Sequence, residues 1–375
     1  MTHPPKKSAL NVMDGISQPS PINEEAARKF RAHRNRSLNT QEYLAGIFSG
    51  NRTILSKAIT LVESSLPSHQ AQAQEIIAEC LKRNTEKGSG VKGQPSSSNS
   101  IRIGITGVPG VGKSTFIEAL GIHLTSRGHK LAVLAIDPSS SRSKGSILGD
   151  KTRMEELSVD ANAFIRPSPA SGSLGGVARK TRETIVLCEA AGFDVIFVET
   201  VGVGQSETTV HSMVDFFLLL MLAGAGDELQ GIKRGIIEMA DAIVINKADG
   251  DNLAKAKIAR VEYANALHLF PPPGSGWTPV ADICSARTKL GIGQVWELIL
   301  EHRKITRETG FFHSRRMEQN RQVFRETIEA GLHDHFFNRS EISHHIAHLE
   351  TEIMNGRLNP YQAAQELLEQ YYRKF

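Results

Sequence analysis

Residues 101–116 read IRIGITGVPGVGKSTF, which is an apolar run, a glycine-rich loop and the start of an amphipathic segment. The loop from Gly107 to Ser114 has the pattern G-x-x-x-x-G-K-S, which binds phosphate groups when it joins a strand to a helix. The flanking residues meet that condition, because 101–106 is predicted as a strand and the apolar spacing after Ser114 predicts a helix that ends near Gly128. The stretch therefore predicts a strand, a phosphate-binding loop and a helix.

The rest of the chain repeats this alternation. Further strands are expected at residues 131–137, 194–199, 214–222, 242–246 and 280–284. Helical or loop segments separate these apolar runs, and everything after residue 293 is helical in pattern. Such alternation predicts an α/β protein with a mostly parallel central sheet flanked by helices.

Composition divides the chain into five parts. We expect a disordered tail at 1–39, a helical extension at 40–83, a Gly/Ser/Lys-rich linker at 84–100, the phosphate-binding domain at 101–305 and C-terminal helices at 306–375. The C-terminal helices carry more apolar positions than one domain face needs. A helical cap on the same domain would use them, and so would a dimerisation arm; unused apolar helix faces favour the arm and a homodimer.

The bulk composition excludes several classes of protein. The chain has 375 residues, 40% hydrophobic and 22% charged, with a net charge of +4. No apolar run is long enough for a membrane span, and no dense basic block indicates nucleic acid. The three cysteines lie too far apart for a CxxC metal site, and residues 1–25 make a poor targeting peptide. We therefore expect a cytoplasmic protein without membrane or nucleic-acid partners.

The phosphate loop assigns roles to consecutive residues. Small residues let backbone N–H groups converge on phosphates, and the helix N-terminus adds positive potential. The Lys113 ammonium is predicted to reach the outer phosphates and assist catalysis, and the Ser114 hydroxyl to bind Mg²⁺. The residues expected to contact the nucleotide here are Gly107, Val108, Pro109, Gly110, Val111, Gly112, Lys113, Ser114 and Thr115.

A second motif identifies the base. Asn246, Lys247 and Asp249 follow an apolar strand, so they should lie at the carboxyl end of the sheet, where nucleotides bind. A carboxylate such as Asp249 can accept two N–H bonds from guanine, and adenine offers no such donor pair. Ser285 and Ala286, after the next strand, resemble a further guanine-contacting loop. The two motifs together predict a P-loop GTPase that binds GTP and GDP.

The segment after residue 194 is predicted to sense the terminal phosphate. Glu199 ends an apolar strand and should face the metal or its waters, with a catalytic role. Gly202 lets the backbone approach the terminal phosphate. Gln205 is a candidate for positioning the attacking water, although it could instead be an ordinary loop glutamine.

Two more acids are candidates for the Mg²⁺ site. Asp137 ends the second predicted strand and Asp150 lies in the following segment. Because Mg²⁺ bound to phosphates takes only one or two carboxylates directly, some of Asp137, Asp150 and Glu199 must act through water beside Ser114. Asp150 could also be a helix-capping acid.

Several runs of sequence resemble one known family. They are DPSSS at 137–141, LGDKTRM at 148–154, RPSP at 166–169, ETVGVGQSE at 199–207 and GDELQGIKRGIIEM at 226–239. With the phosphate loop, these runs are similar to those of the methylmalonyl-CoA mutase-associated GTPases. The resemblance extends from about residue 40 to the C-terminus.

The resemblance implies a function and partners. It implies a homodimeric P-loop metallochaperone whose GTP state gates transfer of adenosylcobalamin from an adenosyltransferase to methylmalonyl-CoA mutase, and removal of damaged cofactor. The GTPase would be slow alone, and mobile elements would fall at 137–153, 202–207 and 223–233. Asp227 and Lys233 are then candidate catalytic residues, unless they form only an exposed ion pair.

Two other functions use the same loop. A small-molecule or protein kinase linked to amino-acid transport would need an acceptor site, and the sequence identifies none. A metal-insertion GTPase would carry a cysteine-rich motif after the phosphate loop, whereas Cys188 is solitary.

Overall fold

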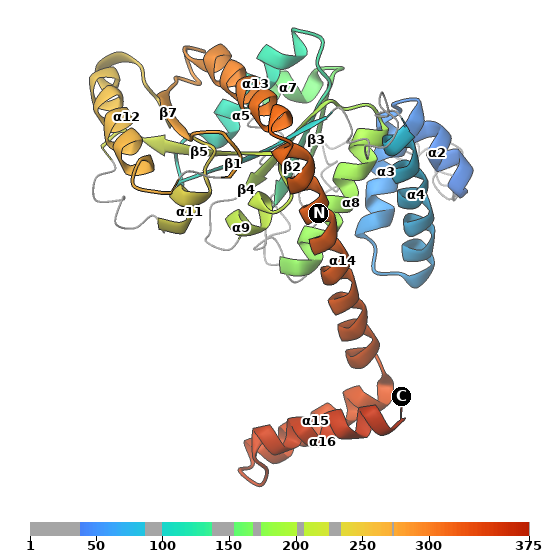
Figure 1. Ribbon diagram of the computed structural model, residues 1–375. Helices are drawn as coiled ribbons and strands as arrows, with labels where there is room; N and C mark the ends of the chain where they lie inside the picture. Colours follow the sequence, from blue (N-terminus) through green and yellow to red (C-terminus); the bar gives the residue numbers. More distant parts are fainter. Residues whose placement is uncertain are drawn as a thin grey trace, which may run out of the picture.

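The computed structural model describes residues 38–86, 100–136, 154–167, 174–200, 206–224, 234–271 and 274–374. A seven-stranded, fully parallel sheet in the order β3-β2-β4-β1-β5-β6-β7 forms its centre (Figure 1). The strands are β1 Ile101–Gly107, β2 Leu131–Ile136, β3 Ala163–Arg166, β4 Val195–Thr200, β5 Phe216–Leu222, β6 Ala242–Asn246 and β7 Val280–Ile283. The predicted α/β architecture is confirmed, and β1 with its phosphate loop lies in the middle of the sheet.

One strand was not expected from the sequence. β3 has four residues, AFIR, and pairs with β2 at the edge of the sheet. Only Ala163 and Phe164 are buried, so its apolar signal is too short to separate from a loop. The longer strands bury nearly every side chain because helices cover both faces of a parallel sheet.

Helices surround the sheet on both faces. The described helices are α2 Thr40–Phe48, α3 Arg52–Glu63, α4 Pro67–Glu86, α5 Lys113–Thr125, α7 Glu155–Val159, α8 Leu174–Ala190, α9 Ser206–His211, α11 Arg234–Met239, α12 Leu253–Leu267, α13 Ile292–Glu308, α14 Phe311–Phe337, α15 Ser340–Met354 and α16 Pro360–Lys374. One apolar core joins α5 and α13 to the sheet, and another joins α8 and α9 to it. Among the described helices, none is both long and apolar enough to cross a bilayer.

The N-terminal helices α2 to α4 belong to the second of these cores. Ile47, Leu55, Ile59 and Ile76 are at most 1% exposed and pack in the same cluster as the buried face of α8. Asn39 begins α2 with a capping box in which its side chain accepts from the backbone of Glu42. The extension is therefore packed onto the sheet domain through α8.

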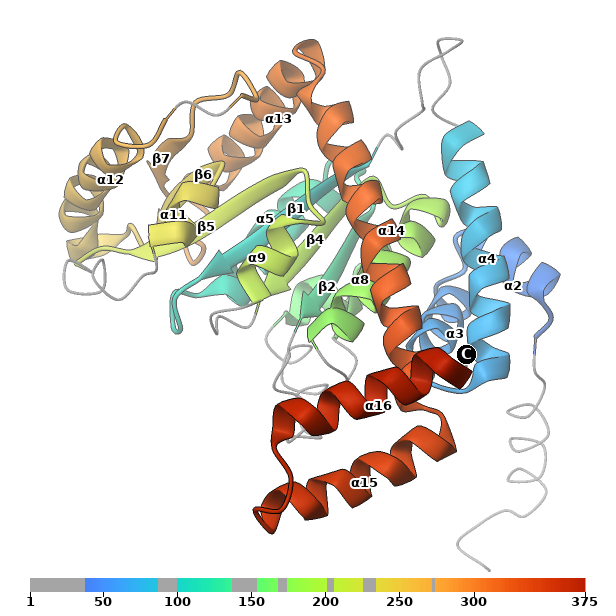
Figure 2. The ribbon, with the colours of Figure 1, turned by 60° about the horizontal axis from the view of Figure 1, so that its bottom comes forward.

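The C-terminal helices leave the sheet domain. α14 starts beside α13 and α8, and its far end carries the α15–α16 hairpin away from the sheet (Figures 1 and 2). The hairpin has its own small core of Ile342, Leu349, Ala363 and Leu367. The hairpin packs on this core of its own rather than on the sheet, and the dimerisation arm stays a prediction.

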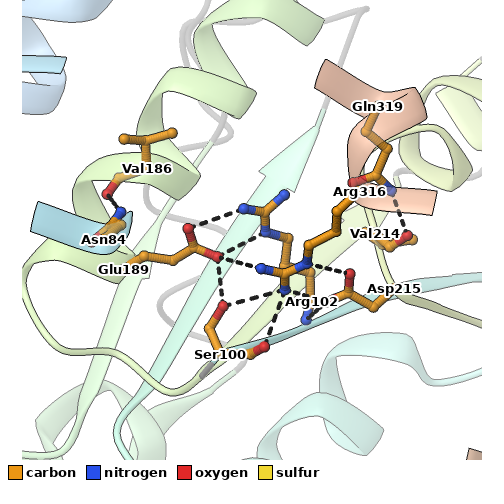
Figure 3. Close-up of polar contacts among 9 residues, drawn as sticks. All are labelled: Asn84, Ser100, Arg102, Val186, Glu189, Val214, Asp215, Arg316 and Gln319. Carbon is orange, nitrogen blue, oxygen red and sulfur yellow. Dashed lines mark hydrogen bonds and ion pairs between the residues drawn. The ribbon is translucent and has the colours of Figure 1, made fainter. Parts of the chain in front are cut away.

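A buried network of charges fixes the root of α14. Arg316 Nη2 lies 2.6 Å from Asp215 Oδ2, at the start of β5, and Arg102 Nε lies 2.8 Å from Glu189 Oε1, on α8. Figure 3 shows the four side chains converging, with Arg316 also donating to the Ser100 carbonyl at 3.1 Å. Burial disfavours ionisation of both acids, but the two guanidinium groups outweigh it and hold the pKa values of Glu189 and Asp215 below their ordinary values.

This network predicts a large effect of Arg316→Met. Losing this cation leaves the buried Asp215 carboxylate without its ion-pair partner and removes one of the two cations beside Glu189, and we expect the free energy of unfolding to fall by ~3–5 kcal/mol at pH 7. Because the folded pKa values are depressed, the network stabilises the fold above the unfolded pKa of ~4 and loses that effect as pH falls below it. In urea denaturation, the difference in unfolding free energy between the parent chain and Arg316→Met should therefore become smaller as the pH falls below ~4. Arg321→Met, on the exposed face of α14, is the control; an equal effect of both would contradict the prediction.

Candidate nucleotide-binding site

The phosphate loop lies between β1 and α5, as its sequence predicts. Gly107 approaches β5 so closely that a Cβ there would lie 2.4 Å from the Leu220 carbonyl oxygen. Gly112 has φ +91° and precedes the first residue of α5, Lys113. A side chain at Gly107 would clash with β5, and the positive φ of Gly112 would strain any other residue. The backbone of the loop can therefore approach a ligand closely, at the N-terminus of a 13-residue helix.

The Lys113 side chain is hydrogen-bonded within the phosphate loop, at the start of α5. Its ammonium donates to the Gly107 carbonyl at 2.8 Å, across the loop. Burial lowers the pKa of Lys113, and the charges of Glu199 and Glu207 oppose that shift. A partly dehydrated cation at a helix N-terminus favours an anion, so this geometry suits a phosphate group.

Asn246 ties the predicted base-reading loop to the phosphate loop. The residue is 1% exposed at the end of β6. Its Nδ2 donates to the Val111 carbonyl at 2.9 Å, and its Oδ1 accepts from the Ala286 backbone N–H at 3.1 Å. Both ends of the amide are thus used inside the protein. The geometry therefore assigns Asn246 a bridging role between the two loops, which the sequence pattern alone did not reveal.

Lys247 makes a second tie. It has φ +59°, and its Nζ donates to the Gly110 carbonyl at 2.8 Å. Its own carbonyl accepts from Asn252 Nδ2 at 2.7 Å, which fixes the turn after β6. Lys247 therefore spans the space between the base-reading turn and the phosphate loop.

Asp249 is the residue predicted to read the base. The side chain is half-buried, and its Oδ2 accepts a hydrogen bond from Ser285 Oγ. Among the described residues, its Oδ1 has no hydrogen-bond partner. Ser285 Oγ also accepts from the Thr288 backbone at 3.2 Å, so this hydroxyl fixes the carboxylate. Ser285 and Ala286 position Asp249 and Asn246; direct contacts of either with guanine stay predictions.

The predicted metal side is described in part. Glu199 lies in β4 at 7% exposure, and Ser114 is half-buried in the first turn of α5. Six other predicted residues lie outside the described residues: Asp137, Asp150, Gly202, Gln205, Asp227 and Lys233. Within the described ranges no group of three or more His, Cys, Asp or Glu side chains could hold a metal. The Mg²⁺ site stays a prediction.

Two features near the phosphate loop were missed at the sequence level. Thr200 Oγ1 donates to Thr106 Oγ1 at 2.8 Å, and both residues are at most 1% exposed. This contact joins the end of β4 to the end of β1. Glu207, 3% exposed in α9, adds a second carboxylate whose charge acts on Lys113. Its position in the sequence, just after the glycine-rich run 202–204, was the signal that could have identified it.

Comparison with known proteins places this site in a family. Residues 55–341 match the model of the methylmalonyl-CoA mutase-associated GTPase MeaB. The chain belongs to the MeaB family. Membership confirms the resemblance seen in the sequence, and it implies guanine-nucleotide binding and GTPase activity at the P-loop.

Individual relatives agree with this placement. The chain is 49% identical over 320 residues to a probable GTPase of Mycobacterium tuberculosis (strain H37Rv), covering 85% of this chain and 91% of the relative. It is 46% identical over 326 residues to the mitochondrial methylmalonic aciduria type A homolog of Mus musculus, covering 87% and 78%. A crystal structure described as LAO/AO transport system kinase superposes with a TM-score of 0.67 at 36% identity, covering 90% of this MeaB-family chain and 100% of the other.

Proposed function

We propose that this chain is a GTP-hydrolysing chaperone that gates delivery of adenosylcobalamin to methylmalonyl-CoA mutase and protects or reactivates that enzyme. The match of residues 55–341 to the mutase-associated GTPases supports the choice of client. The nucleotide assignment has separate support from the hydrogen bond between Asn246 and the phosphate loop, since it couples the base-reading turn to the phosphate cradle. An adenosyltransferase would supply the cofactor, in the cytoplasm.

The side chains divide the chemistry between them. Lys113 would leave the Gly107 carbonyl to meet the β and γ phosphates, and with the loop amides it would stabilise the charge that develops during hydrolysis. Asp249, fixed by Ser285, would accept the two guanine N–H groups. Gly202, Gln205, Asp227 and Lys233 are proposed to act at the terminal phosphate.

Mg²⁺ fits the residues present. The Ser114 hydroxyl lies in the first helical turn after the cradle, and Glu199 supplies a carboxylate at the same edge of the sheet. Oxygen ligands of this kind suit Mg²⁺, which would neutralise phosphate charge. Asp137 and Asp150 are proposed to complete the site directly or through water.

A homodimer is proposed from the arm. Phe324, Ile328 and Leu332 follow one another at intervals of four residues on α14 and are 65%, 46% and 63% exposed. Residues at this spacing share one helix face. A row of large apolar side chains on a protruding helix is typical of a surface that is covered in an assembly, and a second copy of the arm would cover it.

A kinase is the second candidate. The 36% identical structure is described as a transport system kinase, and a kinase would use the same phosphate loop. The two functions differ in the acceptor of the phosphoryl group. A GTPase releases inorganic phosphate in the absence of any added acceptor, and a kinase transfers phosphate to a substrate or protein.

Binding to mutase tests the chaperone proposal. If the GTP state gates the partner, the affinity of the chain for mutase should differ ~5–150-fold between a nonhydrolysable GTP analogue and GDP. Calorimetry with purified methylmalonyl-CoA mutase measures both values, and adenosylcobalamin transfer from the adenosyltransferase should follow the tighter state. Equal affinities in the two nucleotide states, with nucleotide binding intact, would refute the gating role while leaving the GTPase assignment in place.

A further inference from the structure

Helix α9 reaches the nucleotide site at its amino end. Glu207, in its first turn, is 3% exposed, and its charge raises the pKa of Lys113 against the lowering effect of burial. The helix also packs directly on β1, since a Cβ built on Gly104 would lie 2.8 Å from Val210 Cγ1. No side chain separates α9 from the strand that carries the phosphate loop. Gly104 of the strand and Val210 of the helix are therefore in direct contact, three residues before the loop begins.

The other end of α9 leads into residues held by α14. Three side chains of α14 make these contacts, and each binds a different residue of 211–215. Arg315 Nη2 donates to the His211 carbonyl at 3.4 Å, Gln319 Nε2 to the Val214 carbonyl at 2.9 Å and Arg316 Nη2 to Asp215 Oδ2 at 2.6 Å (Figure 3 shows the last two). We name residues 211–215 together with Arg315, Arg316 and Gln319 the arm joint.

Arg182 of α8 adds a bridge across the arm joint. Its Nη2 donates to Ser212 Oγ at 2.7 Å, and its Nη1 pairs with Glu326, further along α14. Arg182 is 9% exposed and the Glu326 side chain 35%, so the guanidinium is buried and the carboxylate is partly in solvent. One buried guanidinium thus links the segment after α9 to the arm helix at a second point.

The arm joint is incompletely satisfied in this arrangement. Gln319 Oε1 and Arg182 Nε are buried and have no hydrogen-bond partner within the part of the chain that the structure describes. Buried polar atoms without partners are uncommon in native proteins and require an explanation. A cavity of about 1110 Å³ lies between α11 and α14 and borders the arm joint. Its lining includes His211 and Gln319. The joint therefore has both unsatisfied groups and adjacent space for a second arrangement.

We propose that the arm joint transmits the nucleotide state to the arm, so that GTP and GDP hold α14 and the α15–α16 hairpin in two orientations relative to the sheet. This inference rests on the proposed function, because it needs GTP at the phosphate loop. When Lys113 turns from the Gly107 carbonyl to a phosphate, the charge facing Glu207 changes and α9 shifts. The 27 residues of α14 form a lever ~40 Å long, so a small rotation at the joint becomes a displacement of several ångströms at the hairpin.

Distances between spin labels test this proposal. Val261 on α12 and Tyr361 on α16 are 53% and 85% exposed and can be replaced by Cys for labelling. The natural residues Cys80, Cys188 and Cys284 are buried and should stay unlabelled. Labelled chain is mixed with an excess of unlabelled chain, so that pairs within one protomer dominate. The label-to-label distance is then measured with GDP and with a nonhydrolysable GTP analogue.

A double variant tests the Arg182 bridge across the arm joint. Ser212→Ala with Glu326→Gln weakens the Arg182 bridge and leaves the buried Arg316 network intact. Glu329→Gln, on an exposed position of α14, is the matched control. Light scattering and urea denaturation confirm that each variant keeps its assembly state and fold, and the binding of the analogue is measured in the same samples.

The outcomes separate the possibilities. The proposal expects the distance to shift by ~5 Å between nucleotides in the parent and in Glu329→Gln, on the scale of a one-turn slide of a helix, and to lose most of that shift in the double variant. Bound analogue without any shift in the parent would overturn it. So would a full shift in the double variant. Absence of analogue binding to the parent would refute the proposed function itself, and this inference with it.

Discussion

Replacing Asp249 with Asn is expected to weaken GTP binding by ~10²–10³-fold, because two charge-assisted hydrogen bonds to guanine are lost at ~1.5–3 kcal/mol each, less what the new amide recovers. The Asn amide also presents N–H donors to the guanine N–H groups. Xanthine carries a carbonyl where guanine has its amino group, so the same variant should gain affinity for XTP. A simple loss of folding would lower both affinities.

Competition against a fluorescent GDP analogue measures these affinities. Asp251→Asn is the matched control, since Asp251 is exposed two residues further along the same turn and should leave GTP binding unchanged. Ser285→Ala is measured in the same assay, because it removes the hydroxyl that donates to Asp249 and leaves the carboxylate itself in place. Unchanged GTP affinity in Asp249→Asn would remove the base-reading role from this residue.

The central part of the fold could be predicted from sequence because its signals are local. The phosphate loop needs particular glycines between a strand and a helix, and the buried strands of a parallel sheet read as continuous apolar runs. Both signals are present from residue 101 onward. The edge strand β3 escaped prediction because two buried residues give no period.

Contacts between distant residues could not be predicted in the same way. Asn246 reaches Val111 across 135 positions, and Arg316 reaches Asp215 across 101. Neither pairing can be recognised from the residues next to it in the sequence. A buried Asn or Arg needs a polar partner, but the sequence does not show which residue supplies it. The direction of the arm was equally hidden, since the same apolar spacing serves a cap or a protruding helix. In the structure the hairpin packs on its own core rather than on the sheet.

Lys113→Ala is expected to have the largest effect on catalysis. Its ammonium lies at the phosphate loop, where burial lowers its pKa and the charges of Glu199 and Glu207 oppose that shift. The substitution removes this cation from the loop. Loss of one such group costs ~10²–10³-fold in rate, and weaker nucleotide binding adds to that loss. Lys130→Ala, before β2 and away from the loop, is the control for general effects on the chain.

Release of inorganic phosphate from GTP tests the central claim most directly. Purified parent chain, Lys113→Ala and Lys130→Ala are each incubated with Mg²⁺ and GTP, and in parallel with ATP, in the absence of any other acceptor. We predict phosphate release from GTP in the parent and in Lys130→Ala, little release from ATP, and release from GTP at least ~10²-fold slower in Lys113→Ala. Equal release from GTP by the parent and by Lys113→Ala would contradict the account.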